Sequence, residues 1–144
     1  MRPEKFIEQL EDQRIVAAIQ LAEAATSGEI RVFVTRNSPA DPLAEAQRQF
    51  AHLGMTRTPQ RNGVLLYLVP RNRTFAIVGD EGIHQRCGQD FWDRVRAEMS
   101  RCFKAGDFTG GVIAGIQSAG TELARHFPKV PGDQNDLPDS VIRD

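Results

Sequence analysis

The residues with the clearest chemical potential are acidic and lie beside the ends of predicted strands. Glu29 opens the segment EIRVFVT, and Asp80 and Glu81 follow a segment that ends at Val78. Carboxylates next to loop carbonyl groups are the ligands that calcium and magnesium prefer. The pattern therefore predicts a low-affinity site for calcium or magnesium, with Glu29, Asp80 and Glu81 as metal ligands.

The loop before the second predicted strand carries basic and amide side chains. Arg57, Arg61 and Asn62 lie there, and guanidinium groups bind phosphate or carboxylate through paired hydrogen bonds. These residues are the predicted substrate-binding set, and the implied partner is an unknown protein or a small phosphorylated ligand. The alternative is that the arginines are solvated loop residues.

A fourth acidic residue, Asp107, lies in the turn between the last two predicted helices and is expected to reach the same site as a metal ligand. Each acid also has a simpler explanation. Asp80 and Glu81 can cap the following helical turn, and Asp107 can cap the last helix. Glu29 can pair with a nearby arginine. Both explanations stay open at the level of sequence.

Other catalytic chemistries have little support. The three histidines lack metal-ligand spacing, and Cys87 and Cys102 form no CxxC pair, so a zinc site is not expected. The sequence contains no GxSxG, GxGxxG or P-loop motif. The catalytic residues, if the protein is an enzyme, are not identified.

Hydrophobic periodicity predicts the elements that position these residues. The order is helix, strand, helix, strand, strand, helix, helix. The predicted helices cover residues 12–25, 41–53, 90–105 and 108–127, after a lead helix at 1–10, and the predicted strands cover residues 29–35, 63–69 and 74–78.

The connections between these strands predict where their ends meet. A long crossover places the first two strands parallel, and the short turn at 70–73 makes the next pair an antiparallel hairpin. The starts of the first two strands and the end of the third therefore share one edge of the sheet. This convergence would bring Glu29, Asp80 and Arg61 together.

The predicted fold class is α/β: a three-layer α/β/α sandwich with a small mixed sheet flanked by helices. One domain is expected over residues 1–128. Residues 129–144 are expected to form a mobile tail, from which Leu137, Val141 and Ile142 could dock. The predicted core includes Leu65, Tyr67, Trp92, Val95, Met99, Ile113 and Ile116.

Composition narrows the class of partner. The 144 residues carry a formal net charge of −1 with no basic stripe, which argues against nucleic-acid binding. No run of apolar residues is long enough to insert into a membrane. The N-terminus lacks the apolar segment of a secretory signal, and the predicted location is the cytoplasm.

Several motifs in order resemble those of the TPM domain family, named from thylakoid-lumen, photosystem II repair and nematode membrane proteins. The motifs are TSGEIRV at 26–32, NGVLL at 62–66, GDEGI at 79–83, FW at 91–92 and GDFTGG at 106–111. The resemblance extends from about Ile15 to Pro128. The chain is most similar to the short, free-standing bacterial type.

This resemblance implies an α/β sandwich and points to Asp80 and Glu81, then Glu29 and Asp107, as metal or phosphate ligands. Some members of the family are described as acid phosphatases and some as calcium binders. We therefore expect a cation-dependent binding or assembly module. The alternative is a metal-assisted acid phosphatase acting on phosphomonoesters; the sequence shows no clear nucleophile for that reaction.

Overall fold

A computed structural model describes residues 10–130 and 139–144 of the chain. In chain order the elements are α2 (Asp12–Glu23), β1 (Glu29–Val34), α3 (Pro42–His52), the short 3-10 helix η1 (Met55–Arg57), β2 (Gly63–Val69), the 3-10 helix η2 (Pro70–Asn72), β3 (Thr74–Gly79), α4 (Glu81–Lys104), α5 (Phe108–His126) and β4 (Ile142–Arg143). The predicted lead helix at 1–10 lies almost wholly outside the described residues.

One mixed sheet of four strands, in the order β3-β2-β1-β4, forms the middle layer. β1 and β2 are parallel, with Glu29 opposite Gly63, and β2 and β3 are antiparallel, with Val64 opposite Gly79. The starts of β1 and β2 and the end of β3 therefore share one edge, which confirms the predicted convergence. We call it the amino edge, and the opposite edge the carboxyl edge.

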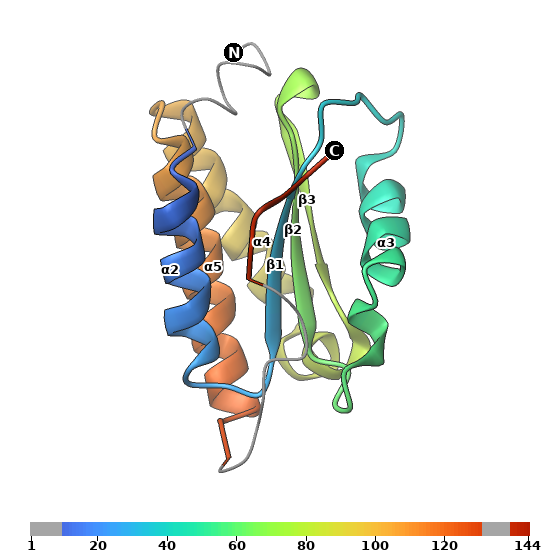
Figure 1. The fold of residues 1–144 in the computed structure, drawn as a ribbon, viewed down its shortest axis with the longest axis vertical. Helices are drawn as coiled ribbons and strands as arrows, with labels where there is room; N and C mark the ends of the chain where they lie inside the picture. The colour runs from blue at the N-terminus through green and yellow to red at the C-terminus, as the bar shows by residue number, and fades with distance from the viewer. Residues whose placement is uncertain (1–9, 131–138) are drawn as a thin grey trace.

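Helices cover both faces of the sheet, as predicted for an α/β/α sandwich. Figure 1 shows α2, α4 and α5 on one side and α3 on the other. Alternate side chains of β1 serve the two faces: Ile30 and Val32 join the larger core, and Phe33 joins the smaller core under α3. Every residue of β2 is buried, as its apolar sequence predicts for a central strand.

The C-terminal segment adds a strand that was not predicted. Ile142 and Arg143 pair in parallel with Phe33 and Val34 of β1. The sequence left open whether this segment docks, and in the structure Val141 and Ile142 pack against the two cores. Leu137, the third residue that could dock, lies outside the described residues.

α4 is longer than the helix predicted over residues 90–105. It begins at Glu81 and continues through Gly88, where φ is 74° and ψ is 173°. This conformation strongly favours glycine, and it kinks the helix into two parts. The prediction captured the second part, because the first part, from Glu81 to Cys87, has only one buried apolar residue, Ile83.

The predicted core is buried with one correction. Leu65, Tyr67, Trp92, Val95, Met99 and Ile116 are buried, whereas Ile113 is only partly buried at the edge of the larger core. Its neighbour Val112 takes the central position on α5. Within residues 10–130 and 139–144, no helix combines the length and the apolar character needed to cross a membrane.

Candidate functional site

At the amino edge, one arginine holds two carboxylates. Arg61 donates to both oxygens of Asp80, from Nε at 2.7 Å and from Nη2 at 2.9 Å. Its Nη1 lies 3.4 Å from Oε1 of Glu81. The Asp80 side chain is 7% exposed, that of Arg61 41% and that of Glu81 63%. One guanidinium faces two carboxylates, so this cluster carries a net negative charge at its solvent side.

The backbone around the cluster is held by close contacts. The Asp80 amide donates to the Gly63 carbonyl at 2.9 Å, and the Gly82 amide donates to the Arg61 carbonyl at 2.8 Å. A Cβ on Gly82 would lie 2.1 Å from the Gln60 carbonyl oxygen, so only glycine fits there. These contacts fix the main chain and leave the side chains of Arg61 and Glu81 as the parts that can move.

Arg61 combines two unusual properties. Its φ of 51° lies in the left-handed region, which is uncommon for a residue with a Cβ. Its hydrogen bonds to Asp80 raise the pKa of the guanidinium above the ordinary value, so it stays charged. A strained, charged residue at a loop-to-strand junction is a reasonable sign of a functional position.

Asp80 also caps α4, because its Oδ1 accepts from the Glu81 amide at 2.8 Å. The capping explanation offered for Asp80 is therefore confirmed, and it does not exclude a ligand role. Glu81 is not a cap. It is the first residue of α4, and its exposed carboxylate adds negative charge where the helix dipole favours it.

Glu29 lies at the amino edge but in a different cluster from Asp80. β2 separates β1 from β3, so one whole strand lies between the two carboxylates. The Glu29 charge acts on Glu23 and Arg31, and all three side chains are buried. The structure therefore does not bring Glu29 together with Asp80 and Glu81 in one set of ligands, as the sequence predicted.

The cluster around Glu29 contains a buried carboxyl pair that was not predicted. Glu23 is 1% exposed; its Oε2 accepts from the Ile30 amide at 2.8 Å, and its side chain faces Asp139. Glu23 Oε1 and Asp139 Oδ1 are both buried without a protein donor. A proton on the Glu23 carboxyl would give the buried Asp139 oxygen a donor. Burial, then the contact with Asp139, raises the pKa of Glu23 to about 10.

A signal for Glu23 was present in the sequence. Ile15, Ile19 and Glu23 recur every four residues, which places Glu23 on the buried stripe of α2. Arg31 likewise occupies an inward-facing position of β1, between Glu29 and Phe33. No sequence signal pointed to Asp139, because it reaches the cluster from the C-terminal segment.

Asp107 does not reach the amino edge, which corrects the prediction for this residue. The 24 residues of α4 carry the chain to the carboxyl edge, where Gly106 lines a cavity together with Pro70 and Arg73. Asp107 caps α5 there, accepting from the Gly110 amide at 2.9 Å. Its alternative role as a helix cap is confirmed.

The remaining predicted residues divide into an exposed arginine and a structural amide. Arg57 is exposed in η1 and makes no ion pair within the described residues. Asn62 is buried; its side-chain amide nitrogen donates to Ser27 Oγ at 3.3 Å, and its backbone carbonyl accepts from the Glu29 backbone amide at 3.4 Å. Asn62 thus joins the starts of β1 and β2 and is poorly placed to bind a ligand.

The available metal ligands at the amino edge are therefore few. Asp80 and Glu81 supply carboxylates, and loop carbonyl groups lie nearby. In the described part of the chain, no group of three histidine, cysteine, aspartate or glutamate side chains is arranged to hold a metal ion. A cation here would bind through two carboxylates, carbonyl oxygens and water, and its affinity would be low.

Comparisons with known proteins agree on the family. A model of the TPM domain matches residues 1–122. The NMR structure of the BA42 protein from the psychrophilic bacterium Bizionia argentinensis is 39% identical, with a TM-score of 0.86, over 94% of this chain and 96% of that one. No curated protein matches the chain.

A second solved structure is similar in fold alone. The N-terminal domain of the cg2496 protein from Corynebacterium glutamicum is 21% identical, with a TM-score of 0.62, over 81% of this chain and 75% of that one. The family model covers most of the chain, and the similarity to BA42 extends over nearly all of it. The chain therefore belongs to the TPM domain family.

Proposed function

We propose that this chain is a cation-dependent binding module whose site is the cluster of Arg61, Asp80 and Glu81. The observation that carries the proposal is the sharing of one guanidinium by two adjacent carboxylates, one of them nearly buried. Calcium or magnesium would compete with Arg61 for these carboxylates. The chain would then respond to a cation without holding one permanently.

Displacement of Arg61 by a cation would change how the chain binds an anionic partner. When a cation occupies Asp80 and Glu81, the Arg61 guanidinium loses both of its acceptors. It becomes available for a phosphate or carboxylate group, and the exposed Arg57 lies in the same loop of the chain. Cation binding and anion binding at this edge would therefore support each other, and the partner would be an acidic protein segment or a small phosphorylated ligand.

The alternative function, a metal-assisted phosphomonoesterase, uses the same cluster differently. It requires a nucleophile or an activated water in line with the phosphorus atom. Ser27 is close to the amino edge, but its hydroxyl accepts from the Asn62 amide and no side-chain base contacts it among the described residues. The geometry supports binding better than hydrolysis.

The proposal is tested by titrating calcium and magnesium into the labelled protein and recording amide NMR shifts. We expect saturable shifts at residues 60–63 and 79–83, with a dissociation constant of about 10⁻⁴–10⁻³ M. Asp80→Asn should abolish them with the fold intact. Asp90→Asn, which removes an exposed carboxylate of the same helix, is the matched control and should titrate like the wild type.

A second variant tests the competition itself. Arg61→Asn keeps a residue that tolerates the left-handed backbone and removes the competing charge. It should tighten calcium binding, and it should abolish the cation-dependent binding of inorganic phosphate. No tightening would show that Arg61 does not compete. No response of the wild type up to about 10 mM, above the range of weak calcium sites, would refute the cation site.

An assay with a chromogenic phosphomonoester separates the two functions. Turnover that depends on a divalent cation and disappears in Asp80→Asn would favour the phosphatase. Cation binding without turnover, in the wild type and in Asp90→Asn alike, would favour the binding module.

A further inference from the structure

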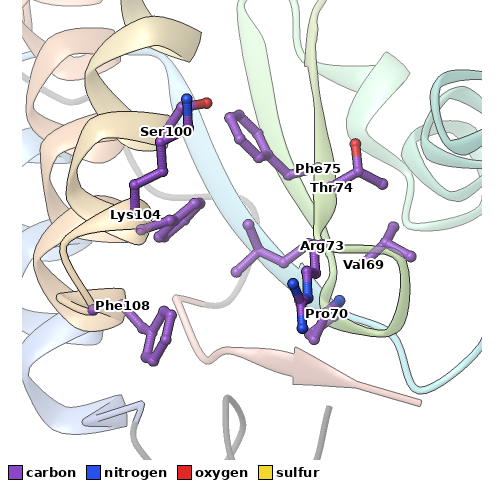
Figure 2. Close-up of a pocket in the computed structure, with 11 residues that line it drawn as sticks. Val69, Pro70, Arg73, Thr74, Phe75, Ser100, Lys104 and Phe108 are labelled. Atoms are coloured by element: carbon purple, nitrogen blue, oxygen red, sulfur yellow. The ribbon is translucent and has the colours of Figure 1, made fainter. Parts of the chain in front are cut away.

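A cavity of about 470 Å³ opens at the carboxyl edge, at the opposite end of the strands from the Arg61 cluster. One wall is the turn end of the β2–β3 hairpin, and the other is the end of α4 with the start of α5. Figure 2 shows Phe75, Arg73 and Pro70 on the hairpin wall facing Ser100, Lys104 and Phe108 on the helical wall. The volume is in the range typical of small-molecule sites, about 300–1,000 Å³.

The interior of the cavity is aromatic and apolar. Phe75 and Phe103 meet edge to face, with ring centroids 5.5 Å apart, and Phe103 and Phe108 follow at 6.4 Å. Leu68, opposite Phe75 in the hairpin register, contributes a further apolar side chain. Phe75 and Phe103 are only partly buried, so the cavity has apolar surface that a ligand could cover.

The charged residues of the cavity are both cationic. Arg73 and Lys104 line it from opposite walls, and no acidic residue is among its lining residues. Neither cation forms an ion pair with any residue in the described ranges, whereas Arg48, Arg61 and Arg101 each do. Asp107, the acid closest in sequence to Lys104, is engaged by the Gly110 amide.

Arg73 is held in a costly conformation. Its φ of 52° is left-handed, at the last position of the hairpin turn, where glycine or asparagine would be less strained. From this position Arg73 lines the apolar cavity on its hairpin wall (Figure 2).

We propose that this cavity binds an amphipathic anion. The apolar part of the ligand would lie among Leu68, Phe75 and Phe103, and a carboxylate or phosphate head would lie between Arg73 and Lys104. The site is separate from the Arg61 cluster and does not depend on the proposed function. If the cation site failed its test, this proposal would be unaffected. If the cavity failed its test, the proposed cation site would be unaffected.

The test compares probes that share a decyl chain and differ in the head group. Decanoate, decyl phosphate, decanol and decyltrimethylammonium are titrated separately into the labelled protein below their micelle concentrations. We expect saturable amide shifts at Phe75, Ser100 and Gly106 with decanoate or decyl phosphate, and the tighter of the two identifies the head group. Decanol should bind at least about fivefold more weakly, the ratio that one ion pair of about 1 kcal/mol implies.

Matched variants locate the charge. Arg73→Asn and Lys104→Gln should each weaken decanoate binding about fivefold for the same reason. Arg71→Gln and Arg101→Gln remove equal charges from the same turn and the same helix end, outside the cavity, and should leave the affinity unchanged. The proposal would be overturned if the two control variants lost as much affinity for decanoate as the two cavity variants. It would also be overturned if decanol bound as tightly as decanoate.

A blocking variant locates the apolar part. Ser100→Phe places a ring inside the cavity and should abolish the binding of decanoate and decanol alike, while an unchanged melting profile shows that the fold is retained. Asp80→Asn should bind decanoate normally. Shifts that persist in Ser100→Phe, or the absence of any saturable shift in the wild type, would show that the cavity is not a site for these ligands.

Discussion

Glu23 illustrates how one residue can change the chemistry of a core. It occupies a position on α2 where isoleucine would be expected from the spacing of Ile15 and Ile19. Its carboxyl faces Asp139, with Glu29 and Arg31 in the same buried cluster. Burial penalises a second negative charge beside Asp139, and the carboxyl therefore keeps its proton through neutral pH.

This proton makes stability depend on pH in a definite direction. Below about pH 4.5 Glu23 is protonated in both the folded and the unfolded chain, and its contribution to stability is fully present. As the pH rises toward about 10, only the unfolded chain releases the proton. The free energy of unfolding should then fall, by at most about 1.4 kcal/mol per pH unit.

Glu23→Gln tests this prediction because the amide keeps the shape and can donate to Asp139. Denaturant unfolding measured from pH 5 to pH 9 should show a much smaller decline in the variant than in the wild type. Glu98→Gln, on the exposed face of α4, should keep the wild-type slope. A variant slope equal to that of the wild type would place the proton elsewhere.

At the scale of a single element, the apolar residues on one face of α5 differ in how deeply they are buried. Ile116 is wholly buried in the larger core, and Ile113 lies at its edge. Ile116→Ala should therefore cost about 2–5 kcal/mol, from lost transfer free energy and the cavity left behind. Ile113→Ala should cost clearly less, because part of its side chain is already in water. Urea unfolding of the two variants gives the comparison, and equal losses would contradict the packing described.

The kink in α4 depends on the backbone of Gly88 alone. A Cβ added there would meet no atom within 4 Å, so a substitution is penalised only by its φ of 74° and ψ of 173°. Gly88→Ala should lower the free energy of unfolding by about 1–3 kcal/mol. Gln89→Ala, at the next exposed position, should change it little. If Gly88→Ala were stabilising, as alanine is inside a regular helix, the kink would not persist in solution.

At the scale of the whole molecule, the C-terminal segment joins parts that are far apart in sequence. Asp144 accepts from Thr35 Oγ1 at 2.6 Å and from the Arg36 amide at 2.8 Å, and Arg143 pairs with Asp12 of α2. Figure 1 shows the segment running beside β1. It pairs with the last two residues of β1, Phe33 and Val34, and brings Asp139 to Glu23.

Removal of residues 139–144 should therefore destabilise the domain. The free energy of unfolding should fall by about 1–3 kcal/mol, because the partly exposed hydrogen bonds to the Asp144 carboxylate are lost. The truncated chain should also lose most of the pH dependence described for Glu23, since the carboxyl would no longer face Asp139. Asp144→Asn, which removes the charge and keeps the strand, should lose stability but retain that pH dependence. A truncated chain as stable as the full chain would show that the segment contributes nothing.

Sequence patterns were sufficient to predict β1, β2 and β3 and which ends of these strands meet. The apolar run of β2, the long crossover and the short turn determine which strand ends meet, and the register of Glu29 with Gly63 agrees with them. The two-residue β4 gave no signal because so short a strand has no periodicity.

The candidate site was predicted less well, for two physical reasons. The order and direction of the strands predict which strand ends lie together, but they do not predict which side chains interact there. Glu29 interacts with Glu23 and Arg31, and no pattern in the loops specifies this interaction. Asp107 was misplaced because α4, at 24 residues and about 1.5 Å per residue, carries the chain to the opposite edge. The family motifs did not help here, since Gly79 packs on Trp92 and Gly82 on the Gln60 carbonyl, so both glycines are structural.

The buried proton of Glu23 also changes how the molecule behaves among other molecules. The formal net charge of −1 counts every carboxyl as ionised. With Glu23 neutral, the folded chain at pH 7 has no net charge on the same count. It is then close to its isoelectric point at neutral pH, where colloidal repulsion is weakest and precipitation easiest. Its unfolding at that pH releases a proton to the buffer, so the unfolding heat will change with the ionisation enthalpy of the buffer chosen.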